Sequence, residues 1–393
     1  MKLQHKDDLI RVAMLADFPY RQDDLYRGGV MQANYRLVQA LAAADGVDLH
    51  VWTPTIKTKV KESRQVGNGT VTYFPLPNQG YGVGVLYYGL RRVVNELVNE
   101  VEPDLLHAQG HPSYIFTALQ CKLPVLVTIH GIYRNELPVS KVRKSVRNSF
   151  SDRLVSKIED YNCAKISNLI AITRQIEDWV RARSPRARIF RMNNAIDEQF
   201  FNLENRNSKP VILFVGWVTH RKGVHLLAEA FQSILPTVQD AELRIVGLDA
   251  VDLEYGRSLR TQYARLIEAK QMVFLGGINQ DQLYEEMSEC AVLCLPSLAE
   301  SAPMVIAQAM AAGKPVIATR VGGVPEMVEE GVTGRLCEPD DPDQLALCLL
   351  DVLRDQSMRR EMGKRARAVA VQRYRADSVA QSTLNAYCAV LGR

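Results

Sequence analysis

Residues 292–318 read Val292-Leu-Cys-Leu-Pro-Ser-Leu-Ala-Glu300-Ser-Ala-Pro-Met-Val-Ile-Ala-Gln308-Ala-Met-Ala-Ala-Gly313-Lys-Pro-Val-Ile-Ala318. Two short apolar runs, Val292–Leu295 and Val316–Ala318, predict buried strands. Between them Pro303 fits the first position of a helix, where the missing N–H of proline leaves no hydrogen bond unmade. The order strand, helix, strand predicts a βαβ unit with two parallel strands.

The same alternation runs along the chain in two series. The first series is predicted to contain a helix at Met31–Ala43 and strands at Arg11–Leu15, Val47–Thr53, Val71–Pro75, Leu105–Gln109, Val125–His130 and Leu169–Thr173. The second is predicted to contain strands at Val211–Val215, Leu243–Val246, Val273–Leu275, Val292–Leu295 and Val316–Ala318. Asn202–Lys209, between them, has the composition of a linker. We therefore predict an α/β protein with two doubly wound domains whose strand-end loops face a shared cleft.

Composition excludes several other classes of protein. A chain of 393 residues that is 47% hydrophobic and 23% charged suits two globular domains. A net charge of +4, with no basic stripe interleaved with aromatic residues, does not favour nucleic-acid binding. The seven cysteines form no CxxC pair, which favours buried thiols in a reducing compartment. Without a signal-peptide pattern or an apolar run of roughly 18 residues, we expect a cytoplasmic protein.

Two loops carry the residue types that bind phosphate. Gly28 and Gly29, after Arg27, leave space for a ligand at the start of a helix, although Gly-Gly alone also suits a simple loop. This pattern is not the GxGxxG fingerprint, so a nicotinamide cofactor is not supported. After the strand Val211–Val215, the adjacent cations Arg221 and Lys222 suit a diphosphate. A solvated surface pair is an equally good interpretation of these two residues alone.

The loop before the helix at Pro303 is the third candidate. Glu300 could accept hydrogen bonds from sugar hydroxyls, and the free amides of Met304 and Val305 would favour an anion. Gln308, about one turn into the helix, could reach a ribose. An ordinary capped helix is the alternative for each part, but the whole string is more specific.

This string resembles the signature of the large retaining glycosyltransferase family with the GT-B fold, in which a Glu is followed after seven residues by a second Glu. The likeness continues through Gly322-Gly323-Val-Pro325-Glu326 and Gly331-Val-Thr-Gly334. Weaker matches precede it in the family's order, at Arg27-Gly28-Gly29, Pro103-Asp104-Leu-Leu-His107, Thr128-Ile-His130-Gly131, Asn194-Ala-Ile-Asp197 and Lys222-Gly223.

The resemblance implies domains at residues 1–203, on the acceptor side, and 204–374, on the donor side, with a helix at about 375–393 returning to the first. It implies catalytic roles for His130, near the C6 hydroxyl of the donor sugar, and for Glu300, on its other hydroxyls. Lys222 would bind the diphosphate, and Ile278 would face the nucleobase. The remaining donor-binding residues that it implies are Gly28, Gly29, Arg221, Gly247, Ser301, Pro303, Met304, Val305 and Gln308. No metal and no cofactor other than the nucleotide sugar are expected.

Two positions depart from the family's pattern. The second Glu of the signature is Gln308, and the Arg expected after Gly216 is Trp217. Arg221 could supply the missing charge from a neighbouring position. The departures keep open a non-catalytic protein that binds nucleotide or glycan, whereas His130, Lys222 and Glu300 together favour the enzyme. An epimerase of the same fold is a further alternative, against which the Glu300 string argues.

The segment 139–158 combines an apolar stripe with many cations. Its apolar residues recur every three to four positions, and six Lys and Arg residues surround them, against Asp152 alone. Such a helix could lie on an anionic membrane surface, as the lipid-linked acceptors of many relatives would require. A helix packed on its own domain is the favoured alternative. Taken together, the resemblance implies a retaining, metal-independent hexosyltransferase acting on a glycan or lipid-linked acceptor, and we expect it in the cytoplasm or at the inner membrane face.

Overall fold

The computed structural model describes residues 9–21, 24, 28–75, 86–133, 146–207 and 209–393, and side chains are described outside 146–151. The chain divides into two compact units. Unit 1 contains residues 1–133, 143–195 and 376–393, and unit 2 contains residues 196–375 together with the short segment 134–142, which lies outside the described residues. The change of unit at Ala195 falls somewhat before the expected one at residue 203.

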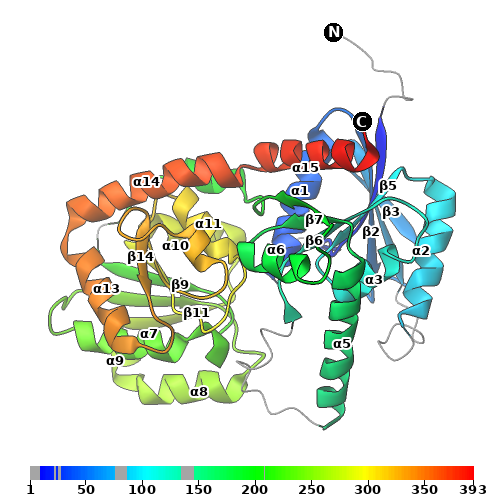
Figure 1. Ribbon diagram of the computed structural model, residues 1–393. Coiled ribbons are helices and arrows are strands. Elements are labelled where there is room, and N and C mark those ends of the chain that lie inside the picture. The colour runs from blue at the N-terminus through cyan, green and yellow to red at the C-terminus, as the bar shows by residue number, and fades with distance from the viewer. Residues whose placement is uncertain (1–8, 22–23, 25–27, 76–85, 134–145, 208) are drawn as a thin grey trace. The chain divides into compact units, whose positions relative to one another are not determined.

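Unit 1 is built on an eight-stranded sheet in the order β3-β4-β2-β1-β5-β6-β7-β8 (Figure 1). Its strands are β1 Ile10–Leu15, β2 Val47–Thr55, β3 Glu62–Val66, β4 Gly69–Pro75, β5 Leu105–Gln109, β6 Val125–Ile129, β7 Asn168–Ala171 and β8 Arg188–Arg191. Its helices are α1 Gly29–Ala43, α2 Tyr88–Val101, α3 Pro112–Ala118, α5 Val146–Lys165, α6 Arg174–Arg181 and α15 Ala376–Leu391. All neighbouring strands pair in parallel except β3 with β4. The strand order reverses between β1 and β5, so ligands are expected at the carboxyl ends of these strands.

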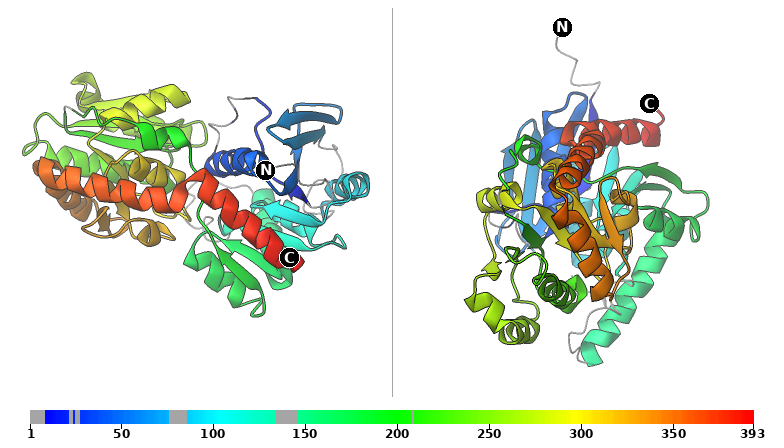
Figure 2. Two further views of the ribbon diagram at one scale, coloured as in Figure 1. Left: turned by 90° about the horizontal axis from the view of Figure 1, so that it is seen from above. Right: turned by 90° about the vertical axis from the view of Figure 1, so that its left-hand side faces the viewer.

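The last helix of the chain completes the core of unit 1. α15 packs along α1, as Figures 1 and 2 show in red and blue. The two helices cover the sheet face that carries Val12 and Met14, both fully buried. Leu384 and Tyr387 of α15 belong to the same cluster of buried residues. Unit 1 therefore depends on a segment that follows all of unit 2 in the sequence.

Unit 2 has a six-stranded parallel sheet in the order β11-β10-β9-β12-β13-β14. Its strands are β9 Val211–Val215, β10 Glu242–Val246, β11 Met272–Gly276, β12 Val292–Leu295, β13 Val316–Thr319 and β14 Gly334–Cys337. Its helices are η4 Glu198–Asn202, η5 His220–Lys222, α7 Val224–Ile234, α8 Leu253–Gln262, α9 Ala264–Glu268, α10 Gln280–Glu289, α11 Met304–Ala311, α12 Val324–Met327, α13 Pro342–Arg354 and α14 Gln356–Tyr374. Counted from β9, this is the Rossmann order 3-2-1-4-5-6, with its reversal between β9 and β12.

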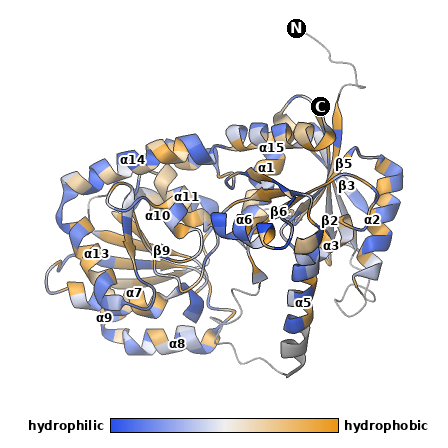
Figure 3. Cartoon of the chain, viewed as in Figure 1, coloured by the Kyte–Doolittle hydropathy of each residue, from blue (hydrophilic) through white to orange (hydrophobic). Residues whose placement is uncertain are grey.

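The predicted strands are confirmed, to within one or two residues at their ends, and three strands were not predicted. The strands of both sheets hold the apolar residues, as Figure 3 shows in orange. β3 was missed because Glu-Ser-Arg-Gln-Val is a polar edge strand with exposed side chains. β8 is likewise a short edge strand, so the first series does not end at Leu169–Thr173 as expected. β14 was missed because it directly follows a turn in the sequence and begins with Gly334, and glycine is not typical of strand interiors.

The supposed linker at 202–209 is held to unit 2 by a buried lysine. The Lys314 ammonium, fully buried, donates to Asn205 Oδ1 at 2.7 Å and to the carbonyl oxygens of Ser288 and Cys290 at 2.7 and 2.8 Å. All three ammonium hydrogens thus have acceptors without a carboxylate. Burial lowers the pKa of Lys314 because charge is costly away from water.

Candidate functional site

The candidate donor site lies in unit 2, where β9 and β12 are neighbours and the strand order reverses. The loop after β9 and the loop after β12 touch through the backbone, because Leu298 N–H donates to Arg221 O at 2.8 Å. Gly223 makes this approach possible, since a Cβ there would lie 2.0 Å from Pro296 O and its φ of +68° favours glycine. The loops carry Lys222 and Glu300 to the same edge of the sheet.

Lys222 and Glu300 form a buried ion pair. The Lys222 ammonium donates to Glu300 Oε1, and Ser297 Oγ donates to the same oxygen at 2.7 Å. Only 13% of the Lys222 side chain and 8% of the Glu300 side chain are exposed. Lys222 is therefore not a solvated surface cation, which was one of the two interpretations of Arg221 and Lys222 that the sequence left open.

The charges around Glu300 keep it ionised. Burial by itself would raise the pKa of this carboxyl, but the positive charges of Lys222 and Arg221 outweigh burial, and the pKa lies below its ordinary value. Arg221 contributes from the same loop, and its Nη1 donates to Ala299 O at 2.8 Å. The site thus presents a fixed carboxylate beside two cations.

The helix after this loop begins one residue later than predicted. α11 starts at Met304, and Pro303 is its N-cap because a ψ of 119° places that residue outside the helical region. The amides of Met304 and Val305 remain in the first turn, where helical N–H groups lack helical acceptors. Ser301 Oγ, just before, is buried and has no hydrogen-bond partner within the described part of the chain. Gln308, 5% exposed, lies one turn further along.

Two further predicted residues of unit 2 lie on adjacent strand ends. Gly247 follows β10, and a Cβ on it would lie 1.8 Å from Gly216 O, so the loops after β9 and β10 are in close contact. Ile278 follows β11 and is half-buried. The structure therefore places Arg221, Gly247, Ile278 and Glu300 on the carboxyl ends of four consecutive strands of the sheet order.

The predicted residues of unit 1 lie at the corresponding edge of its own sheet. Gly28 is the N-cap of α1 and Gly29 its first residue, and a Cβ on Gly28 would meet nothing within 4 Å. His130 directly follows β6 and is half-buried. Burial lowers the pKa of His130 to about 4, although a hydrogen bond with Asn194 opposes that shift. A small cavity, which includes Gln109, Asn194 and Thr383 in its lining, borders the ring.

Sequence reasoning missed two side chains that contact the predicted residues. Gln109 Oε1 lies 2.9 Å from His130 Nε2, and Ser297 bonds Glu300 as described above. The available signal for Gln109 was its position two residues after His107 on a strand, which places both side chains on one face. Ser297 stands in the quoted string, directly after Pro296.

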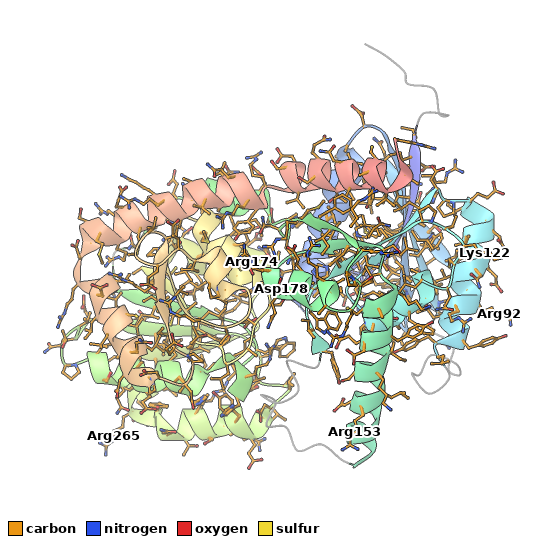
Figure 4. The ribbon with its side chains drawn as sticks, in the orientation of Figure 1. Arg92, Lys122, Arg153, Arg174, Asp178 and Arg265 are labelled. Atoms are coloured by element: carbon orange, nitrogen blue, oxygen red, sulfur yellow. The ribbon has the colours of Figure 1, made fainter. Side chains whose placement is uncertain are left out.

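The segment proposed as a basic membrane helix is described only in part. Residues 134–145 lie outside the described residues, as do the side chains of 146–151. In the remainder, Ile158 is buried and Leu154 half-buried, and α5 packs on α3. Arg153, labelled in Figure 4, and Lys157 are exposed. The described part is a packed helix with a polar outer face, and membrane contact stays a prediction.

Two successive units with parallel sheets of Rossmann type, the second carrying a cation–carboxylate pair where its strand order reverses, are typical of the GT-B class of glycosyltransferase. The profile of "Glycosyl transferases group 1" matches residues 195–369, and that of "Glycosyltransferase Family 4" matches residues 27–200. The chain belongs to the group 1 glycosyltransferases. The predicted resemblance to the GT-B glycosyltransferases is thereby confirmed, and retention of anomeric configuration stays a prediction.

Individual relatives agree with this assignment. The chain is 27% identical to the sulfoquinovosyl transferase SQD2 of Arabidopsis thaliana over 70% of its own length, and 26% identical to the phosphatidyl-myo-inositol mannosyltransferase of Mycolicibacterium smegmatis over 98%. These alignments cover 54% of the Arabidopsis protein and 95% of the mycobacterial one. The chain spans about half the length of several other curated relatives that it matches. Sucrose-phosphate synthase from Thermosynechococcus elongatus has the same fold, with a TM-score of 0.80 at 19% identity over 98% of this chain and 99% of that one. Anabaena HepE, in complex with UDP and glucose, has a TM-score of 0.72 at 20% identity over 97% and 100% of the two chains.

Among the described helices, none is both long and apolar enough to cross a membrane.

Proposed function

We propose that this protein transfers a hexose from a nucleotide-diphosphate sugar to a glycan or lipid-linked acceptor, with retention of anomeric configuration and without a metal ion. The observation that carries this proposal is the buried contact between Lys222 and Glu300 beside Arg221. A carboxylate held ionised next to cations can accept hydrogen bonds from sugar hydroxyls while the cations bind the phosphates.

The chemistry of the reaction explains why cations are needed there. When the bond between the anomeric carbon and the diphosphate breaks, negative charge develops on the leaving group, and prearranged positive groups lower the barrier. Lys222 and Arg221 would provide that charge, together with the first amides of α11. Arg221 would replace the arginine that the family carries at the position of Trp217.

Relatives support the choice of donor. HepE is described in complex with UDP and glucose, and the two curated relatives named above are a sulfoquinovosyl transferase and a mannosyltransferase by name. The nucleobase is proposed to lie at Ile278, the ribose at Gln308 and the phosphates also at Gly28 and Gly29. Glu300 and His130 are the proposed catalytic residues.

A panel of UDP-, GDP- and ADP-sugars in a thermal-shift assay tests the proposal. A cognate donor at 100 times its Kd should stabilise the protein by about 2.7 kcal/mol. Transfer is then followed by NMR, which reports the anomeric configuration of the product, with and without EDTA. An inverted product, or activity that EDTA removes, would contradict the corresponding part of the proposal.

A non-catalytic binding protein is the second candidate. Gln308 and Trp217 favour it, because both replace charged residues of the family's pattern. Stoichiometric binding of a nucleotide sugar without hydrolysis or transfer to any acceptor would support this second candidate.

A further inference from the structure

A chain of hydrogen bonds connects α15 to His130. Tyr387 Oη on α15 lies 2.8 Å from His107 Nδ1. On the other side of that ring, Gln109 Nε2 lies 3.2 Å from His107 Nε2, and Gln109 Oε1 lies 2.9 Å from His130 Nε2. All four residues belong to unit 1. We name Tyr387, His107, Gln109 and His130 the relay.

The sheet of unit 1 makes the relay possible. His107 and Gln109 are two residues apart on β5, so their side chains lie on one face. Thr128 lies opposite Gln109 in the register of β5 and β6, and its hydroxyl is 2.8 Å from His107 Nε2. His130 follows two residues later, at the end of β6. His107, Gln109 and Tyr387 are each at most 1% exposed.

The hydrogen-bonding capacities of these groups determine where each proton lies. Burial lowers the pKa of His107 to about 3, so its ring is neutral and has one donor and one acceptor nitrogen. An amide nitrogen can only donate, so His107 Nε2 accepts from Gln109 and Nδ1–H donates to Tyr387 Oη. The amide oxygen of Gln109 can only accept, so His130 Nε2 carries the proton.

We propose that Gln109 is a positioning residue that fixes the ring orientation of His130 and holds its proton on Nε2, and that Tyr387 sets the direction of the relay through His107. The importance of the relay for catalysis rests on the proposed function, in which His130 is a catalytic residue. The location of the His130 proton is a property of the free protein and can be measured without substrate. Reversal of the Gln109 amide would move the proton of His130 to Nδ1, so one amide decides the tautomer.

NMR of the full-length protein with ¹⁵N-labelled histidine tests the tautomers directly. In the parent, the ring nitrogens of His130 should show the proton on Nε2, and those of His107 the proton on Nδ1. Tyr387→Phe removes the acceptor of the His107 proton. It should therefore produce a mixture of tautomers at both histidines, although the substituted atom does not touch His130. A parent His130 protonated on Nδ1, or unchanged spectra in Tyr387→Phe, would overturn the proposal.

Gln109→Glu separates positioning from simple packing. A carboxylate at this position still accepts from His130 Nε2–H, but its charge should raise the pKa of His130 by about 1–3 units. His107, the titratable neighbour in the relay, remains neutral, and Asn194 carries no charge. A Gln109→Leu variant, which removes the hydrogen bond to His130, has Gln39→Leu on α1 as its control. The control makes the same chemical change outside the relay, so it should leave the NMR signals of His130 unchanged. A His130 titration that does not move in Gln109→Glu would count against the relay.

Turnover supplies the second measurement. With the nucleotide sugar that shifts the melting temperature in the panel, Gln109→Leu should lower kcat roughly tenfold, the equivalent of one hydrogen bond, with KM little changed. Gln109→Glu should restore most of kcat above the raised pKa of His130. Absence of turnover in the parent would contradict the proposed function, while the tautomers would still confirm or refute the relay.

Discussion

Replacing Lys222 with methionine tests the central contact of the site. Breaking a buried ion pair by removing one partner costs about 3–5 kcal/mol, because the other charge stays buried. Here Arg221 and the Ser297 hydroxyl still stabilise Glu300, so we expect unit 2 to lose roughly 2–3 kcal/mol. That loss corresponds to about 30- to 150-fold more frequent opening of the segments around β9 and β12.

The loss should depend on pH in a definite direction. In the parent, the pKa of Glu300 is lowered, so its stabilising contribution is full above the ordinary value of 4.5 and is lost as the pH falls through the folded pKa. Without the positive charge of Lys222, less charge counteracts the effect of burial, and the pKa of Glu300 rises. The difference in stability between parent and Lys222→Met should therefore be full near pH 8 and become smaller as the pH falls toward 4.5.

Hydrogen exchange followed by mass spectrometry measures this loss for unit 2 separately. Lys364→Met, an exposed position on α14, is the matched control and should change the free energy of unfolding by less than about 0.5 kcal/mol. Adding Glu300→Gln to Lys222→Met removes the unpaired charge and should recover more than half of the loss. A loss as small as the control's, or one that is independent of pH, would refute the reasoning.

Three other predictions concern Glu300, Gln308 and the basic segment 139–158. Glu300→Gln should abolish transfer while unit 2 stays folded, and it should cost less stability than Lys222→Met because Gln still accepts from Lys222; unchanged turnover would contradict the assignment of Glu300. Gln308→Glu should tighten donor binding by about 1 kcal/mol in calorimetry, the difference between a charged and a neutral hydrogen bond; weaker binding would mean that the pocket is arranged around a neutral side chain. Replacing Arg143, Lys144 and Arg147 with Gln should release the protein from anionic vesicles and spare activity on a soluble acceptor; unaffected co-sedimentation would leave 139–158 as a packed helix.

The fold was predictable where strands are buried on both faces. Val211–Val215 and Val292–Leu295 are continuous apolar runs, and their predicted bounds match the structure. β3 could not be found in this way, because its antiparallel position at the sheet edge leaves its side chains in water. A polar edge strand has no hydrophobic period to detect.

The candidate residues could be selected from the sequence, but the contacts between their side chains could not. Lys222 and Glu300 were selected separately, and they are 78 positions apart in the sequence. Their contact depends on β12 pairing with β9 while β10 and β11 lie on the other side of β9, which the spacing of residues does not display. The pair also explains why the sequence left a surface position open for Lys222: its ion pair depends on a carboxylate from a distant loop.

The position of α15 has a consequence for biosynthesis. A ribosome completes residue 195 long before it reaches Ala376, and at 5–20 residues per second the interval lasts roughly 10 to 35 seconds. Throughout that time the nascent first unit has an uncovered apolar surface on β1 and α1, where Val379, Leu384 and Tyr387 will later pack. Unit 2, whose main segment is continuous, can finish folding before unit 1. Chaperones that bind exposed apolar surface should therefore associate with nascent chains until residues 376–393 emerge, and a premature stop codon at Ala376 should yield an insoluble product even though unit 2 is intact.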